Sequence, residues 1–95
     1  MELRNAVIRI LMETGVGCHL LGYEYLLEAI LLCWNDRKHI HMVTKTLYPT
    51  IAERFDTTPQ CVERNIRTAI SRSRSKQSNS GYIAAAIWFL EYLGY

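Results

Sequence analysis

The sequence lacks strand signals, long apolar runs and a cysteine framework, and each absence narrows the class of protein. Stretches of alternating apolar and polar residues are nearly missing, which points away from a β fold. No run is long enough to span a bilayer, and no signal-peptide pattern opens the chain. Cys18, Cys33 and Cys61 are odd in number and lie in unrelated contexts, which favours reduced thiols in a cytoplasm over disulfides.

Catalytic and metal-binding patterns are also missing. The chain has no glycine-rich phosphate loop, no paired carboxylates and no nucleophile with its base, so we expect no enzyme, cofactor or small-molecule substrate. The metal-ligand residue types are Cys18, His19, Cys33, His39 and His41. Their spacings match no zinc pattern, so core cysteines and surface histidines are the favoured interpretation, and we expect no metal.

What the chain does contain is helical periodicity. Its 95 residues, 49% of them apolar, fit a single globular domain over 1–95. Apolar spacing predicts helices over 2–13, 23–34, 39–47 and 82–93, with a glycine-containing loop over 14–22. Trp34 and Trp88 are expected in the core. We therefore predict an all-α fold, a small bundle of five to six helices that includes a helix-turn-helix.

The helix-turn-helix lies between Tyr48 and Ile70. Pro49 suits the first position of a helix, Asp56 and Thr57 supply turn chemistry, and Thr58 is a good N-cap before Pro59. The first helix should face inward with Ile51, Ala52 and Phe55. The second, predicted over 59–73, should bury Val62, Ile66, Ala69 and Ile70. In this motif the second helix enters the DNA major groove.

The outward face of the second helix carries the candidate DNA contacts. Its first turn presents Gln60, Glu63 and Arg64, where a recognition helix reaches base edges. Arginine can donate two hydrogen bonds to guanine, glutamine can pair with adenine, and glutamate can accept from cytosine. The remaining candidates are the turn residues Thr57 and Thr58, then Arg67, Thr68, Ser71, Arg72 and Arg74.

Positive charge is concentrated on this segment. Residues 60–76 hold five basic side chains against one acidic, a local charge of +4, whereas the whole chain carries +2. Such a stripe is typical of a phosphate-binding surface, so Arg72 and Arg74 should contact phosphates. The alternative is an ordinary solvated helix. For His39 and His41, beside Lys38 and Lys45, added phosphate contacts and solvated charge both remain open.

A family resemblance supports DNA binding. The segments GVGCHLLGYEYLLEAI at 15–30, TKTLYPTIAERFDTTPQCVERNIRTAI at 44–70 and SNSGYI at 78–83 resemble the DNA-binding effector domain of the stage-zero sporulation protein A family, regulators of endospore formation in Firmicutes. The resemblance implies an all-α domain that binds short promoter elements, often as tandem copies. It implies base contacts by Glu63 and Arg64, with Gln60, Arg67 and the Thr57–Thr58 turn near bases or phosphates.

Three departures from the family pattern stand out. Gln60-Cys61 replaces a typical Ser-Arg, which removes one basic contact and can alter element preference. The family usually has a longer segment, with another helix, between the recognition helix and the SNS motif. That segment helps tandem domains meet in the family, so the mode of pairing stays open for this chain. No phosphoacceptor receiver domain precedes the effector domain, so the chain is a fragment or a stand-alone relative. A helix directly after Met1 favours the stand-alone form.

Two features of the C-terminal third carry further expectations. The serine-rich basic stretch 71–81 has no apolar residue and is predicted to be a mobile connector. The helix 82–93 is apolar around most of its circumference, so it is either enclosed in a monomer or joins two copies whose recognition helices read paired sites. The alternative function is a protein-interaction module that binds a related regulator through this helix.

Overall fold

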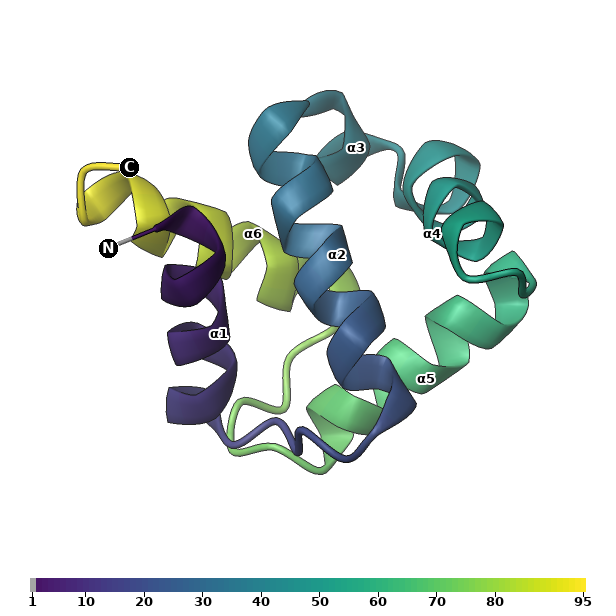
Figure 1. The fold of residues 1–95 in the computed structure, drawn as a ribbon, viewed down its shortest axis with the longest axis horizontal. Coiled ribbons are helices and arrows are strands. Elements are labelled where there is room, and N and C mark those ends of the chain that lie inside the picture. The colour runs from purple at the N-terminus through teal and green to yellow at the C-terminus, as the bar shows by residue number, and fades with distance from the viewer. Residues whose placement is uncertain (1) are drawn as a thin grey trace.

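The protein is a bundle of short helices (Figure 1). The computed structural model describes residues 2–95, which contain six α-helices, one π-helical segment and no strand. In chain order the elements are α1 (Leu3–Thr14), α2 (Leu21–Asn35), α3 (Lys38–His41), η1 (Val43–Leu47), α4 (Tyr48–Arg54), α5 (Pro59–Ser71) and α6 (Asn79–Tyr92). The predicted all-α class and the number of helices are confirmed.

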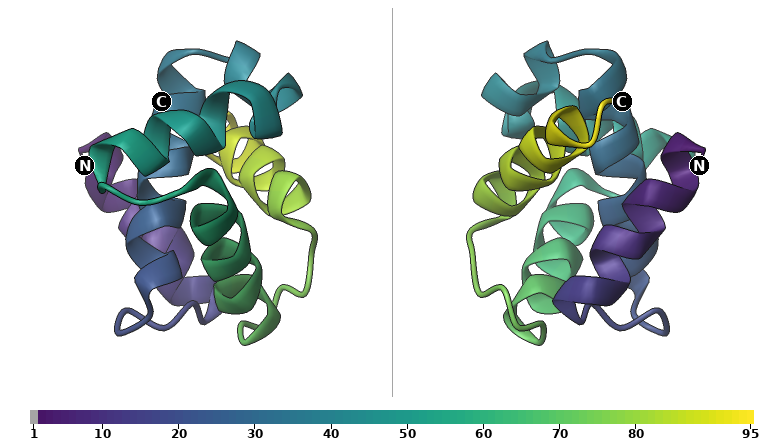
Figure 2. Two further views of the ribbon diagram at one scale, coloured as in Figure 1. Left: turned by 90° about the vertical axis from the view of Figure 1, so that its right-hand side faces the viewer. Right: turned by 90° about the vertical axis from the view of Figure 1, so that its left-hand side faces the viewer.

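Helix α2 lies at the centre and contacts α1, α4, α5 and α6 (Figures 1 and 2). Its core side chains include Leu26, Ile30 and Cys33, all fully buried. Helices α1 and α5 lie on opposite sides of it. The bundle is therefore organised around one buried helix, and α5 has one side on the core and one side free.

Gly22 lies where α2 and α5 meet. The sequence prediction placed this residue in the loop 14–22 and was wrong, because α2 already begins at Leu21. A Cβ atom at position 22 would lie 2.1 Å from the carbonyl oxygen of Asn65 and 2.9 Å from the Cβ of Ala69. Only glycine lets the two backbones approach this closely.

The predicted helix 39–47 is two elements. Met42 has φ −134° and ψ 48°, outside the helical region, and divides α3 from the π-helical segment η1. The Thr46 hydroxyl donates to the Met42 carbonyl at 3.0 Å and lies 2.9 Å from Nδ1 of His39. This side-chain bonding holds the break in place, and a pattern of apolar spacing does not reveal it.

The connector is shorter and better anchored than predicted. Helix α5 ends at Ser71, not at residue 73, and α6 begins at Asn79, with Ser78 as an N-cap that accepts from the Gly81 N–H. Within residues 72–78, Ser73 is buried and donates to the Ile70 carbonyl at 2.6 Å. Serine hydroxyls can satisfy the backbone locally, so part of this polar segment packs on the bundle, while its mobility stays a prediction.

Three aromatic side chains are more exposed than predicted. Trp88 was expected in the core but is 65% exposed, and Trp34 is half-buried beneath the Arg37 guanidinium, 4.8 Å from its ring centroid. Phe55 was expected to face inward but is 38% exposed, with its ring edge-on to Tyr25 at 5.2 Å. The core is filled mainly by aliphatic residues instead.

Candidate nucleic-acid interface

The turn between α4 and α5 has the geometry that its residues predict. Asp56 takes the left-handed conformation with φ 52°, which aspartate tolerates better than most residues. The Thr57 N–H donates to the Ala52 carbonyl at 2.9 Å, and the Thr58 hydroxyl accepts from the Cys61 N–H at 3.1 Å. Pro59 is the first residue of α5. A capped start and a closed turn fix the direction in which α5 leaves α4.

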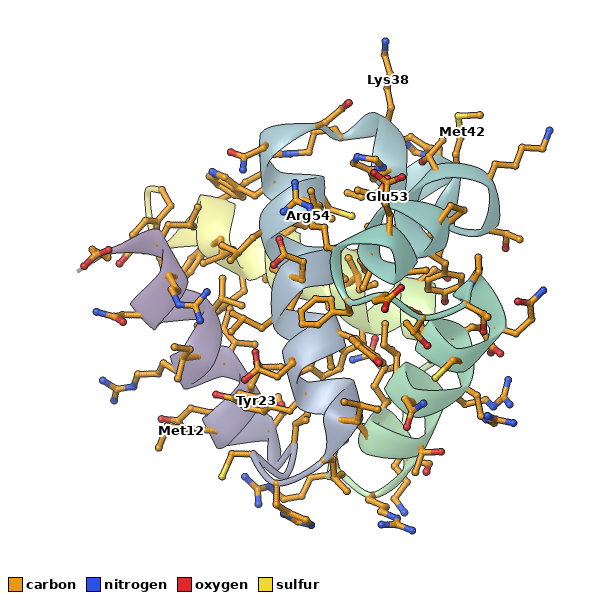
Figure 3. The ribbon with its side chains drawn as sticks, turned by 45° about the vertical axis from the view of Figure 1, so that its right-hand side comes forward. Met12, Tyr23, Lys38, Met42, Glu53 and Arg54 are labelled. Atoms are coloured by element: carbon orange, nitrogen blue, oxygen red, sulfur yellow. The ribbon has the colours of Figure 1, made fainter. Side chains whose placement is uncertain are left out.

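Helix α4 is also tied to the centre of the bundle. The Arg54 guanidinium lies over α2 (Figure 3) and donates to the Glu28 carboxylate at 2.6 Å. Ile51 and Ala52 are buried against the core as predicted. Because α4 and α5 contact each other and both contact α2, the two helices of the motif pack as one unit.

Helix α5 divides cleanly into an inner and an outer side. Its inner residues Val62, Ile66, Ala69 and Ile70 are all buried, as predicted. Gln60, Arg64, Arg67 and Ser71 are exposed, and Glu63 and Thr68 are partly exposed. The left view of Figure 2 shows α5 in front of the bundle with no helix covering it. The predicted base-reading side chains therefore share one free side.

The charged side chains on the outer side of α5 form few ion pairs within the protein. Arg67 forms an ion pair with Glu63, one turn earlier on α5. Such an exposed pair contributes at most about 1 kcal/mol, so a nucleic acid can replace it at little cost. Arg64 makes no ion pair among residues 2–95. The free guanidinium of Arg64 is the group best placed to donate two parallel hydrogen bonds.

The candidates beyond Arg67 separate into two groups. Thr68, Ser71 and Arg72 lie at the C-terminal end of α5, where the Ser71 hydroxyl donates to the Thr68 carbonyl at 2.8 Å. Arg74 is directed elsewhere. Its guanidinium donates to the Glu13 carbonyl, and its backbone N–H donates to the Thr14 carbonyl at 2.9 Å. Arg74 therefore caps the end of α1. The expectation of a freely available Arg74 is not met.

Asn79 is a positioning residue that the sequence prediction missed. Its amide donates to the Tyr48 hydroxyl at 3.0 Å and to the Glu63 carbonyl at 3.1 Å, which joins α6, α4 and α5. Burial raises the pKa of Tyr48 above its ordinary value, and the bond from Asn79 acts in the opposite direction. The only sequence signal was the position of Asn79 within the SNS motif.

The remaining features concern metal ions, the basic side chains near η1 and the membrane. Residues 2–95 hold no group of three or more His, Cys, Asp or Glu side chains placed to bind a metal ion. His39 is bonded to Thr46, while Lys38, His41 and Lys45 stay exposed near η1. No described helix combines the length and apolar character needed to cross a membrane.

Comparison with known protein families agrees with this geometry. Residues 7–86 match the family described as Sporulation initiation factor Spo0A C terminal. The match includes all of α2 to α5, the turn between α4 and α5, and the start of α6. Members of this family are DNA-binding effector domains of a sporulation regulator. The chain belongs to the family of the sporulation initiation factor Spo0A C-terminal domain.

Proposed function

We propose that this chain is a sequence-specific DNA-binding transcriptional regulator of the sporulation initiation type, which reads promoter elements by inserting α5 into the major groove. One observation carries the proposal. Helix α5 is capped at Thr58, packed on one side by its apolar stripe, and free on the other side, where Gln60, Glu63 and Arg64 lie in the first two turns. The N-terminal part of a recognition helix is the part that reaches base edges.

The side chains of this face have distinct roles in the proposal. Arg64 donates to guanine, Glu63 accepts from cytosine and Gln60 pairs with adenine. Arg67 leaves its ion pair with Glu63 to contact a base or phosphate. The turn and the far end of the helix bind the phosphate backbone through Thr57, Thr58, Thr68, Ser71 and Arg72. Arg74 acts indirectly, because it holds the connector against α1.

A gel-shift titration tests this function. The purified domain is titrated onto a duplex that carries the family's promoter element and onto a scrambled duplex of the same length and composition. We expect the binding free energy on the promoter element to be more favourable than on the scrambled duplex by about 4–10 kcal/mol, the range typical of sequence-specific DNA-binding proteins. Equal affinity for both duplexes at every salt concentration would contradict sequence-specific recognition.

The exposed aromatic side chains of α6 favour a second candidate role in protein binding. Trp88 and Tyr92 face solvent, where a soluble domain seldom leaves a large apolar patch uncovered. The partner is either a related regulator or a second copy of this chain, joined through residues 82–93.

Cys18, Cys33 and Cys61 are free thiols, the state expected in a reducing cytoplasm, where we propose that the domain acts.

A further inference from the structure

A groove of about 700 Å³ lies between α1 and α6. Its walls are mainly apolar, with Ala6 and Ile10 on α1 and with Ala85 and Phe89 on α6. The hydroxyls of Thr14 and Tyr82, also in its lining, lie 2.5 Å apart and satisfy each other. Because this polar pair is already bonded, the groove offers apolar surface far more than free hydrogen-bonding groups.

An aromatic surface adjoins the groove along the outer side of α6. The ring centroids of Trp88 and Tyr92 are 6.0 Å apart, and those of Phe89 and Tyr92 are 6.3 Å apart, both pairs stacked. Tyr92 is 74% exposed. Ala84 and Ala85 precede these rings by one turn and are also exposed. The face thus offers bulky side chains next to small ones, a pattern that can interlock with itself.

The rim of the groove is self-complementary in charge. Arg9 and Glu13 line its α1 edge one turn apart, where they form an ion pair with each other at 3.4 Å, and both side chains are 67% exposed. Such an exposed pair is weak, so it can be exchanged for a pair between copies. A two-fold symmetric contact pairs residue i with residue j and j with i. If two α1 helices cross antiparallel with the axis between these positions, Arg9 of each copy faces Glu13 of the other. The exposed Trp88 and Phe89, together with the smaller Ala84 and Ala85, then lie within the same contact.

We infer that the α1–α6 face seats a second copy of this chain in a two-fold symmetric, antiparallel contact. The occupant is a second copy because both the charges on the rim and the sizes of the side chains on α6 complement themselves. The contact would cover the apolar surface that the monomer leaves in water. The self-association itself needs no DNA.

The placement of the face determines what such a pair can do, given the proposed binding of DNA by α5. Figure 2 shows α1 and α6 in front in one view and α5 in front in the opposite view. The free side of α5 therefore points away from the groove. Two copies joined at α1 and α6 carry their recognition helices at opposite ends of the assembly, each end one monomer width from the contact.

Adjacent half-sites on one duplex need two recognition helices on the same side, with centres about 34–36 Å apart. A pair joined through the α1–α6 face does not meet this condition. The pair instead joins two separate stretches of duplex. This differs from the arrangement expected from the sequence, in which the paired helices read neighbouring sites.

Charge exchange between copies tests the contact without DNA. In Arg9→Glu both rim charges are acidic, and in Glu13→Arg both are basic, so each variant repels its own copies. We expect sedimentation equilibrium to show wild-type self-association, a loss of about tenfold or more in each variant, and recovery in their equimolar mixture. Arg4→Glu makes the same charge change on α1 outside the groove lining and should leave association within about twofold of wild type.

Two outcomes would overturn the contact. The first is a wild-type chain that remains monomeric at all concentrations. The second is an equimolar mixture that associates no better than either variant alone, because Arg9 and Glu13 then do not meet across copies. Circular dichroism of each variant identifies any loss of fold, and the mixture remains informative since both partners carry only exposed changes.

Capture of one duplex by another tests the arrangement. One duplex with the promoter element is tethered to beads and a second is fluorescent. Wild type should retain the fluorescent duplex, Arg9→Glu should bind single duplexes but lose retention, and Arg4→Glu should behave as wild type. In the contrary outcome, wild-type protein self-associates and binds single duplexes but fails to retain the fluorescent duplex on the beads. That result overturns the bridging inference and leaves the proposed function intact. Failure on single duplexes counts against the proposed function, while sedimentation still decides the contact.

Discussion

Helices α5 and α6 are alike in length and in how they begin, yet their free sides are opposite in chemistry. They have 13 and 14 residues, and each is capped by a hydroxyl, from Thr58 and Ser78 respectively. The free side of α5 is polar and basic, whereas that of α6 carries Trp88 and Tyr92. A charged side is stable in water, but an uncovered aromatic side favours a protein partner. The contrast supports the proposal that α5 binds a polyanion and α6 binds a protein.

The inner sides of the two helices differ as well. Helix α5 touches α2 through backbone at Gly22. Helix α6 packs through ordinary side chains such as Ile83, Ile87 and Leu90. The orientation of α5 therefore tolerates less change than that of α6, since a side chain can move to a new rotamer and a backbone carbonyl cannot.

The largest effect should come from Gly22→Ala. Alanine gains about 1 kcal/mol of helix propensity over glycine, but its methyl group would meet the Asn65 carbonyl at 2.1 Å. We expect a net loss of about 3 kcal/mol in the free energy of unfolding, measured with urea. Gly17→Ala is the control, because there the nearest atoms to the new methyl group belong to the movable side chains of His19 and Leu20. Equal stability of the two variants would contradict the close approach of α2 and α5.

Arg64→Ala should have the next largest effect, on DNA binding and not on stability. Loss of one bidentate base contact weakens binding to the promoter element by about 1–3 kcal/mol and leaves the scrambled duplex nearly unaffected. Fluorescence anisotropy on both duplexes measures this difference. A fall by the same factor on both duplexes would show that Arg64 contacts phosphate.

Asn79→Ala should destabilise the fold by about 1–2 kcal/mol, since two hydrogen bonds between α6, α4 and α5 are lost. The variant removes the polar link between the two helices compared above. Ser80→Ala, a change at the exposed neighbouring residue, should alter stability by less than about 0.5 kcal/mol. If thermal unfolding cannot distinguish the two variants, Asn79 does not position α5.

The sequence predicted those parts of the fold that depend on local chemistry and periodicity. Pro49, Thr58 and Pro59 mark their helix starts correctly, and the stripe of α5 is buried as its spacing indicated. The exposure of Trp88 does not follow from periodicity, because a helix that is apolar around most of its circumference has no polar side to mark which face is free.

The start of α2 and the structure of the connector depend on contacts distant in the sequence. Gly22 reads as a loop residue until α5 is placed against it. Arg74 contacts the end of α1, about 60 residues earlier in the chain, and no local pattern identifies such a partner. At the candidate site, the outward residues were identifiable from spacing, whereas the role of Asn79 required the assembled bundle.

The smallest effect separates two arginines that the sequence alone treats alike. Arg72 is exposed at the end of α5, whereas the guanidinium of Arg74 is bonded to the Glu13 carbonyl. Arg72→Ala should therefore reduce the slope of log K against log salt by about one. Arg74→Ala should leave that slope nearly unchanged and lower the free energy of unfolding by about 0.5–1 kcal/mol, because the carbonyl groups at the end of α1 lose a cationic partner. Anisotropy titrations over a salt series, with urea unfolding of the same samples, measure both quantities. A slope reduced by one in Arg74→Ala would mean that the guanidinium leaves α1 to neutralise a phosphate when DNA binds, and the basic surface of the protein would then extend from α5 onto the connector.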